Sequence, residues 1–290
     1  MIPASELILN ADGTIYHLHL HPEQVAPDII TVGDPERVKE ISRRFDRIDE
    51  RVEAREFVTH TGELNGKRLT VISTGIGTDN VDIVLNEIDA LFNVDLGKRT
   101  VKQTLTTLNF LRLGTSGSLQ ANLPLDSLLL SEAALALDGL LPYYRDAVVA
   151  DAALSAHLSA RDVTLPTVPI VVQPRYPAFI TASSTGTIAR GITLTAAGFY
   201  APQGRSIRLP SRLTPALLAA LRSYRRADGL RITNIEMETA GIYGLANALE
   251  HRAASLSALL ANREAGTFSS RPGETVERLI ETGLLLLTDR

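Results

Sequence analysis

The sequence contains no cysteine and no tryptophan, and only 5% of its residues are aromatic. Without cysteine, the chain cannot form a disulfide, bind a metal through thiolates or use a cysteine nucleophile. The first residues, Met1 to Glu6, also lack the basic segment and apolar core of a secretory signal. We therefore expect a cytoplasmic protein.

Lysines are few and do not cluster; they stand at Lys39, Lys67, Lys98 and Lys102. The formal net charge is -4 and the pI is near 5.9, so a nucleic-acid-binding surface is not expected. Most of the positive charge is arginine, and several arginines stand beside glycine-rich turns. This placement suits the planar recognition of small anions.

Long apolar runs and linkers are absent as well. The most apolar tracts, 127–137 and 284–287, are too short or too interrupted to span a bilayer, so no membrane partner is expected. With 44% hydrophobic and 21% charged residues, the chain can bury a large globular core. No Pro/Ser/Gly-rich stretch or charge run divides it, and we expect residues 1–290 to form a single domain.

Strands and helices alternate in the sequence pattern, which indicates an α/β fold. Residues 28–32 are expected to form a buried strand, followed by a helix over 35–45 with proline in its first turn. Strands at 56–63 and 67–73 are expected to pair as a hairpin around Asn65-Gly66.

The remainder of the chain continues this alternation. The pattern predicts further helices at 81–92, 215–226, 238–251 and 274–287, and further strands at 110–113, 127–135, 168–172, 192–197 and 254–260. The segment 162–191 is rich in Pro, Ser and Thr, and it is interpreted as a loop insertion between a helix and a strand.

Three predicted strands end in glycine turns, at Gly33-Asp34-Pro35, Gly75-Ile76-Gly77 and Gly114-Thr115-Ser116-Gly117. Backbone N–H groups at such turns, together with nearby arginines and a threonine hydroxyl, are the groups needed to hold a phosphate-like oxyanion. Each turn alone is more typical of an ordinary strand end. None matches a P-loop, and 75–80 lacks the third glycine of a dinucleotide fingerprint.

Taken together, these motifs resemble those of the nucleoside phosphorylase superfamily, and within it the uridine phosphorylases. The resemblance covers nearly the whole chain and rests on the blocks Tyr16-His17-Leu18, Gly33-Asp34-Pro35-Glu36-Arg37-Val38, Arg55-Glu56-Phe57, Ser73-Thr74-Gly75-Ile76-Gly77, Leu111-Arg112-Leu113-Gly114-Thr115-Ser116-Gly117, Phe199-Tyr200-Ala201-Pro202-Gln203-Gly204-Arg205, Glu236-Met237-Glu238 and Asn262-Arg263. It implies a three-layer α/β/α fold with a central mixed, partly barrel-like sheet flanked by helices.

For phosphate, the resemblance implies binding by Gly33, Arg37, Arg112 and Thr115. It also implies that Arg55 reaches the phosphate of a neighbouring subunit, so a homo-oligomer is expected, either a dimer or a trimer of dimers. Forked arginine donors suit this task, because an anionic nucleophile must be desolvated and aimed at C1′ of the sugar.

For ribose, the triplet Glu236-Met237-Glu238 precedes an apolar helix, and an extended chain would put both carboxylates on one face. Alone, the triplet is typical of the acidic first turn of a helix. The resemblance implies that Glu238 accepts hydrogen bonds from the ribose hydroxyls, that Met237 lines the sugar, and that His17 contacts the 5′-hydroxyl in the adjacent subunit. Fixing those hydroxyls matters because the sugar becomes oxocarbenium-like as the bond to the base breaks.

For the base, the resemblance implies selection by Phe199, Gln203 and Arg205. An aromatic ring can stack on the base, while the amide and guanidinium match the edge of uracil. Arg205, together with Arg263, would stabilise the negative charge of the departing base. Asn262 stands where purine-specific relatives have an aspartate, which favours uracil over purine.

A metal site is the main alternative use of the histidines. His17, His19 and His21 would share one face of a strand, as in a metal-dependent amidohydrolase, but the other histidines lie in no ligand motif, and we expect no metal. No role is assigned to His19 or His21. Some bacterial relatives bind an alkali cation with a glutamate equivalent to Glu56, but residues 78–82 depart from their usual small residues, which weakens that assignment.

The sequence therefore favours an enzyme that converts uridine and phosphate to uracil and ribose 1-phosphate without an organic cofactor. A nucleosidase that uses water is one alternative, although Arg37, Arg112 and Thr115 would then have no phosphate to bind. A nucleoside-binding or storage protein of the same fold is another, because a fold does not fix a function. Deoxyuridine, thymidine and modified pyrimidine nucleosides all remain candidate substrates.

Overall fold

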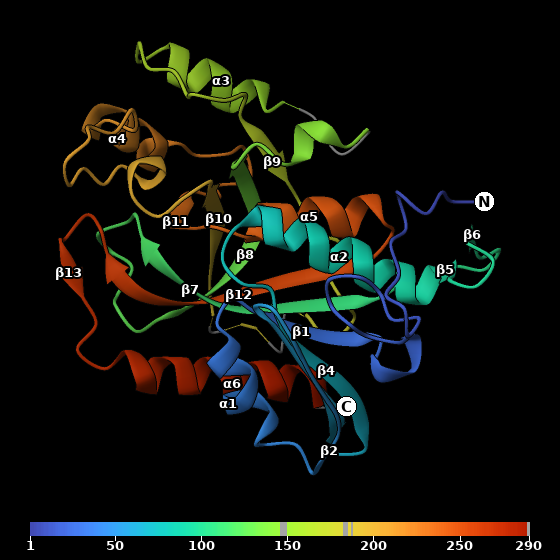
Figure 1. The fold of residues 1–290 in the computed structure, drawn as a ribbon. Coiled ribbons are helices and arrows are strands. Elements are labelled where there is room, and N and C mark those ends of the chain that lie inside the picture. The colour runs from blue at the N-terminus through green and yellow to red at the C-terminus, as the bar shows by residue number, and fades with distance from the viewer. Residues whose placement is uncertain (146–149, 182–184, 187, 289–290) are drawn as a thin grey trace.

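A mixed sheet runs through the whole molecule in the computed structural model, which describes residues 1–145, 150–181, 185–186 and 188–288. Its strands are ordered β13-β12-β8-β10-β11-β7-β1-β4-β3-β2, and β9 pairs with β8 (Figure 1). The strands span β1 Asp28–Val32, β2 Arg47–Ala54, β3 Phe57–Leu64, β4 Lys67–Ser73, β7 Asn109–Ser118, β8 Leu128–Leu137, β9 Ile170–Val172, β10 Ala189–Ala196, β11 Ile232–Glu236, β12 Arg252–Asn262 and β13 Thr267–Phe268.

Six α-helices among the described residues surround this sheet: α1 Pro35–Ser42, α2 Thr78–Asn93, α3 Ala152–Ser159, α4 Pro215–Ser223, α5 Thr239–Ala248 and α6 Pro272–Thr288. A separate two-stranded hairpin joins β5 Val94–Asp95 to β6 Thr100–Val101. Short 3-10 turns lie at Pro22–Gln24, Leu141–Tyr143 and Ala201–Gln203. No helix in the described part of the chain is long and apolar enough to cross a bilayer.

Five strands close on one another, because β7 pairs with both β11 and β12 while β8 and β10 complete the ring. β12 runs parallel to β7 along its whole length, from the pair Arg252/Asn109 to the pair Asn262/Ser118. Strands β1, β4, β3 and β2 extend from this barrel as an open wing. The expected mixed, partly barrel-like sheet with flanking helices is therefore confirmed.

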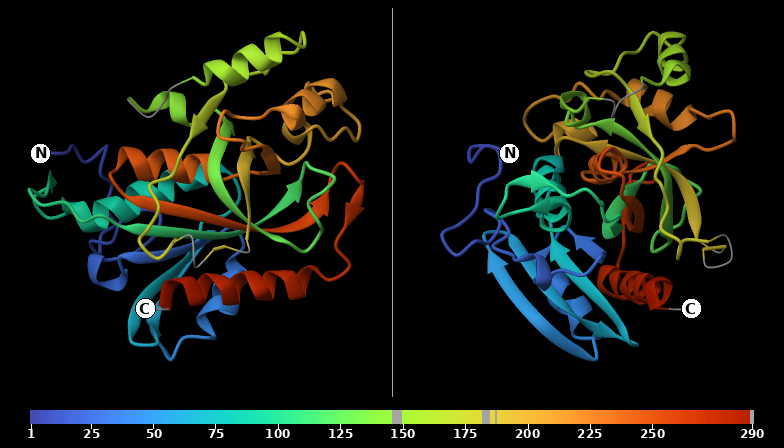
Figure 2. Two further views of the ribbon diagram at one scale, coloured as in Figure 1. Left: turned by 180° about the vertical axis from the view of Figure 1, so that it is seen from behind. Right: turned by 90° about the vertical axis from the view of Figure 1, so that its right-hand side faces the viewer.

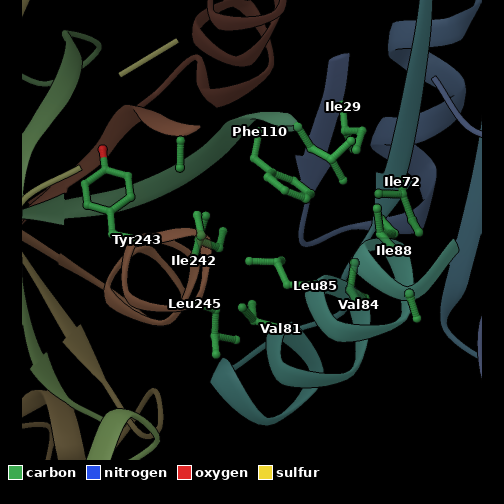
Figure 3. Packing of buried hydrophobic residues seen from close by; sticks show 14 of the residues in the cluster. Ile29, Ile72, Val81, Val84, Leu85, Ile88, Phe110, Ile242, Tyr243 and Leu245 are labelled. Atoms are coloured by element: carbon green, nitrogen blue, oxygen red, sulfur yellow. The ribbon is translucent and has the colours of Figure 1, made fainter. Parts of the chain in front are cut away.

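Helices cover both faces of the wing. Neighbouring residues of a strand point to opposite faces, so each face of the wing contributes its own side chains to a buried cluster. Ile29 packs with α2 and α5 in one buried cluster, whose packing Figure 3 shows. Ile30 faces a second cluster that includes α1 and α6. A third cluster joins α3 and α4 to β8, β10 and β11. Figures 1 and 2 show α3 and α4 at one end of the molecule and α1 and α6 at the other.

Most predicted elements are present. The strand 28–32 and the hairpin around Asn65-Gly66 are confirmed, with Asn65 and Gly66 both at positive φ. The helices predicted at 35–45 and 215–226 end earlier, at Ser42 and Ser223. Strands β2 and β11 and helix α3 have no counterpart among the predictions. Part of the segment 162–191, namely residues 182–184 and 187, lies outside the described residues.

One predicted turn is wrong. The strand predicted at 110–113 does not end at Gly114, because β7 continues through Gly114-Thr115-Ser116-Gly117 to Ser118. Its pairing with β12 supplies hydrogen-bond partners along that whole stretch. The two glycines therefore serve close packing inside a strand rather than a change of chain direction.

Candidate active site

A cavity of about 1080 Å³ opens where parallel strands β1, β4 and β7 reach their carboxyl ends. Ligands of open α/β sheets bind at such an edge, where the strand order changes. On one side, β7 pairs with β1 up to Arg112 and with β11 at Gly117 and Ser118. Between these two residues the edge of β7 has no strand neighbour on that side in the described structure, and this gap lies in the wall of the cavity.

Gly33 and Arg37 line one end of the cavity. Asp34 caps α1 by accepting a hydrogen bond from the N–H of Glu36, which places Arg37 in the first turn of that helix. The Nε of Arg37 is buried and has no partner among the described residues. Burial lowers the pKa of Arg37, and the charge of Arg112 lowers it further. This end of the cavity is thus suited to an anion.

Arg112 lies on β7 and is 5% exposed. Its Nη2 is 2.6 Å from Oε2 of Glu238 and 3.0 Å from Oε2 of Glu236. Burial alone lowers the pKa of Arg112, but the two carboxylates raise it above its ordinary value. A Cβ at Gly114 would lie 1.9 Å from its Nη1, so glycine is required there for the guanidinium to occupy its place.

Glu236 and Glu238 have different roles although they meet the same guanidinium. Glu236 accepts hydrogen bonds from the N–H groups of Glu238 and Thr239 and from the hydroxyls of Thr195 and Thr239, so its oxygens are fully occupied at the start of α5. Among the described residues, Glu238 accepts only from the N–H of Gly77, at 2.8 Å, and from Arg112. Burial raises the pKa of Glu238, against the lowering effect of Arg112.

The predicted convergence of the two carboxylates is therefore present, but the local geometry is not a continuous strand. Glu236 ends β11, whereas Glu238 has φ -135° and ψ -30° and precedes α5. Met237 between them lines the cavity, as does Thr115 on β7.

Phe199, Gln203 and Arg205 line the cavity from the barrel, since they follow β10, whereas Gly33 and Arg37 follow β1 of the wing. The guanidinium carbon of Arg205 lies 3.8 Å from the centre of the Phe199 ring. Its Nη1 donates to Oε1 of Gln203 and to the carbonyl of Phe199, both at 2.6 Å. The three side chains thus form one connected group, in which burial lowers the pKa of Arg205.

Arg263 supports this group from behind. It does not line the cavity, but its guanidinium donates to the carbonyl oxygen of Gln203. Burial, together with the charge of Arg205, lowers the pKa of Arg263 to about 10. Because a Cβ at Gly117 would lie 3.3 Å from the Arg263 side chain, glycine in β7 also makes room here.

His17 and Arg55 do not line the cavity. Nδ1 of His17 is 2.5 Å from Oε1 of Glu87, and the guanidinium of Arg55 lies 5.5 Å from the ring centre of Tyr16. The two predicted residues are therefore close neighbours outside this chain's own pocket.

The histidine-rich segment is not a strand. Residues 16–18 form a turn and His19 has a φ of 52°, so His17, His19 and His21 do not share a strand face. Among the described residues, no three His, Cys, Asp or Glu side chains are grouped so that they could hold a metal ion. Glu56 lines the cavity beside Gly75.

Sequence reasoning missed several residues of the cavity wall. Asn80 and Phe268 line it without belonging to any predicted motif, and Ser116 was considered only as part of a turn. Asn80 lies at the start of α2, where a Cβ on Gly75 would be 2.6 Å from its Nδ2. The signal for Asn80 was its place directly after the second glycine turn. The two-residue strand that carries Phe268 is too short to give a pattern.

The fold and the cavity together define an α/β protein that can hold an oxyanion next to a second, polar ligand. The family model of the phosphorylase superfamily matches residues 27–287, and the chain belongs to this superfamily.

Relatives include the uridine phosphorylase of Thermococcus kodakarensis, which is 32% identical over 275 residues, covering 93% of this chain and 84% of the relative. The uridine phosphorylase of Escherichia coli is 26% identical, covering 94% of this chain and 98% of the relative. Among solved structures, a Trypanosoma brucei nucleoside phosphorylase described as showing uridine phosphorylase activity has a TM-score of 0.82 and 28% identity, covering 98% of this chain and 100% of that one.

Proposed function

We propose that this chain is a uridine phosphorylase, which converts uridine and inorganic phosphate reversibly to uracil and ribose 1-phosphate. The observation that carries the proposal is that one cavity joins an arginine-lined end, a buried carboxylate with few partners, and an aromatic, amide and guanidinium group at the far end. Several relatives that match most of the chain carry the same function in their names.

Phosphate would be held by Gly33, Arg37, Arg112 and Thr115. Two guanidinium groups in a largely buried setting strip water from the anion and orient it, so that one oxygen can attack C1′ of the sugar. The unpartnered Nε of Arg37 is a donor still to be satisfied, as expected of a site that awaits an anion.

Glu238 would accept the ribose hydroxyls beside Met237. Glu238 has two hydrogen bonds within the described part of the chain, which leaves lone pairs for a diol, whereas Glu236, which has more partners, serves to hold Arg112 and the start of α5. A negative charge at this place also stabilises the positive charge that the sugar develops as its bond to the base breaks.

The base would lie against Phe199, Gln203 and Arg205, with Arg263 behind them. Uracil leaves as an anion, and the two cations at this end stabilise it electrostatically. A pKa near 10 keeps Arg263 protonated at neutral pH. Uridine is the proposed substrate, and deoxyuridine and thymidine are the comparisons that define how selective the sugar and base ends are.

The assay is incubation of the enzyme with uridine, with and without phosphate, following uridine absorbance and the sugar product. We expect turnover only with phosphate and ribose 1-phosphate as product. Turnover to free ribose without phosphate would identify a nucleosidase, and tight binding of uridine without turnover would identify a storage protein. Dialysis against a chelator should leave the rate unchanged, because no organic cofactor or metal takes part in the proposed reaction.

A homo-oligomer belongs to the same proposal. His17 and Arg55 lie outside this chain's own cavity, and we propose that they serve the cavity of a neighbouring subunit, Arg55 at its phosphate and His17 at its 5′-hydroxyl. Light scattering would distinguish a dimer from a trimer of dimers. We further propose that residues 1–290 act as one domain in the cytoplasm, which cell fractionation tests.

A further inference from the structure

A group of buried polar side chains stands behind the cavity wall, and the reaction proposed above gives it no role. Ser116 on β7 lines the cavity and is 9% exposed. Behind it lie Asn234 on β11, Thr193 on β10 and Ser131 on β8, each fully buried. The group therefore crosses four strands of the closed barrel, from its far side to the cavity.

Consecutive members of the group are hydrogen-bonded. Nδ2 of Asn234 lies 3.0 Å from Oγ of Ser116. Its Oδ1 accepts from the hydroxyl of Thr193 at 2.9 Å and from that of Thr233 at 3.0 Å. The Oγ atoms of Thr193 and Ser131 are 2.6 Å apart.

Counting protons fixes the direction of these bonds. A hydroxyl has a single proton, and Thr193 gives its proton to Asn234, so Ser131 must be the donor in the pair between them. Asn234 in turn uses its amide N–H to donate to Ser116. Every buried hydroxyl proton of the group then has an acceptor, and the Ser116 proton is left for the cavity.

The structure has the Asn234 amide with Nδ2 toward Ser116 and Oδ1 toward Thr193 and Thr233. In this orientation the hydroxyl of Ser116 accepts from Asn234, and its own proton is directed to the cavity.

Ser116 lies toward the base end of the cavity. Its neighbour Gly117 abuts the side chain of Arg263, which contacts Gln203. Arg112, at the phosphate end, is four residues earlier on the same strand.

We propose that Ser116 donates a hydrogen bond to the base as it departs with negative charge, and that Asn234 is the positioning residue that keeps this hydroxyl pointed as a donor. The inference rests on the proposed uridine phosphorolysis. It involves no proton transfer, since the Ser116 proton stays on its oxygen. A hydrogen bond to a developing anion strengthens during the reaction, so the interaction acts on kcat.

The test compares Ser116→Ala, Ser116→Thr, Asn234→Leu and the double variant Ser116→Ala/Asn234→Leu with uridine and saturating phosphate. We expect kcat to fall about tenfold in Ser116→Ala, the size of one hydrogen bond to a charged group, with the KM for phosphate unchanged. Ser116→Thr keeps the hydroxyl and should stay near the parent rate. The kcat of Asn234→Leu should fall by less than tenfold. The kcat of the double variant should be no lower than that of Ser116→Ala alone.

The leaving group supplies a readout that a purely structural role would not change. 5-Fluorouracil is a more stable anion than uracil, so the loss caused by Ser116→Ala should be smaller with 5-fluorouridine than with uridine. Ser131→Ala is the matched control, because it removes a buried hydrogen bond of the same network while Thr193 still donates to Asn234. Its kcat should match the parent value.

The outcomes separate the two proposals. Phosphate-dependent cleavage by the parent enzyme with an unchanged kcat in Ser116→Ala, or with additive losses from the two positions, overturns the role of Ser116 and Asn234 and leaves the phosphorylase assignment standing. Equal losses with uridine and 5-fluorouridine also overturn it. A parent enzyme that does not cleave uridine with phosphate overturns both.

Discussion

Arg112 is the residue on which the charge balance of the pocket depends. Its guanidinium is the only cation within salt-bridge distance of Glu236 and Glu238 in the described part of the chain, and all three side chains are buried. Removing the cation leaves two carboxylates together in a region of low dielectric constant, where breaking a buried pair costs several kcal/mol. The residue therefore contributes to folding as well as to the proposed chemistry.

We expect Arg112→Ala to lower phosphate-dependent turnover at least a hundredfold, as removal of a key transition-state donor does, and to reduce the free energy of unfolding by about 3 kcal/mol. The double variant Arg112→Ala/Glu238→Gln should recover part of the stability, since one charge is gone, without recovering activity. Urea unfolding and uridine turnover measure the two effects separately. Near-normal turnover in folded Arg112→Ala would remove this residue from the site.

His60 should make stability depend on pH. The ring is 5% exposed, its Nδ1 lies 2.7 Å from Oγ of Ser42, and burial lowers its pKa from 6.5. Because the folded state favours the neutral ring, the unfolded chain binds more protons as the pH falls below about 6.5. The stabilisation is complete above that pH and declines as the pH falls toward the folded-state pKa.

The measurement is the melting temperature between pH 8 and pH 5 for the parent and for His60→Asn, whose amide can take the place of Nδ1 beside Ser42. The parent should lose more stability than the variant as the pH falls below 6.5. Parallel curves for the two proteins would show that His60 does not titrate on unfolding in this range.

At the scale of single elements, strand β7 shows which part of a strand the sequence pattern predicts and which part it does not. The largely apolar segment 110–113, which includes Arg112, predicts the first half of the strand correctly. The second half is Gly114-Thr115-Ser116-Gly117, which locally favours a turn, and only pairing with the distant β12 makes it a strand. The exposed strand β2 and the short strand β11 lack a clear pattern for the same reason, since tertiary pairing defines them.

Gly114 offers a test of that close packing. We expect Gly114→Ala to displace the Arg112 guanidinium, because the new Cβ would lie 1.9 Å from Nη1, and to reduce turnover at least tenfold. Gly273→Ala is the matched control: it adds the same methyl group in α6, where no atom lies within 4 Å, and should leave turnover unchanged. If both variants keep the parent rate, the guanidinium tolerates displacement and the proposed role of Gly114 is wrong.

At the scale of the whole molecule, the sequence motifs predicted which residues gather in the cavity better than they predicted how the chain brings them there. Arg37, Arg112, Gln203 and Glu238 all line it, as expected. The ion pairs between Arg112 and the two carboxylates could not be read from spacing, because they join β7 to the end of β11 through a closed barrel. The resemblance had already implied that His17 and Arg55 serve a neighbouring subunit, and neither lines the chain's own cavity.

Mixing two inactive variants tests the shared site. If Arg55 serves a neighbour, a mixed dimer of Arg55→Ala and Arg112→Ala has both defects in the cavity of the Arg112→Ala subunit, and its other cavity is intact. Co-expression of the two should then restore roughly a quarter of the parent activity in a two-fold symmetric dimer, because one cavity in each mixed pair is intact. Activity that stays at the level of the separate variants would show that Arg55 does not serve a neighbouring cavity.

Between Arg112 and Gly117, β7 pairs with neither β1 nor β11. This gap affects how rigidly the wing and the barrel are held together. Substrates bound as proposed would lie where a strand would otherwise pair with β7, and would connect the wing and the barrel across that opening. We therefore expect uracil together with phosphate to slow amide hydrogen exchange at the ends of β1 and β11 as well as at the contacted residues. Bound substrate would thus hold the wing and the barrel together, and the protein would be more rigid with substrate bound than without it.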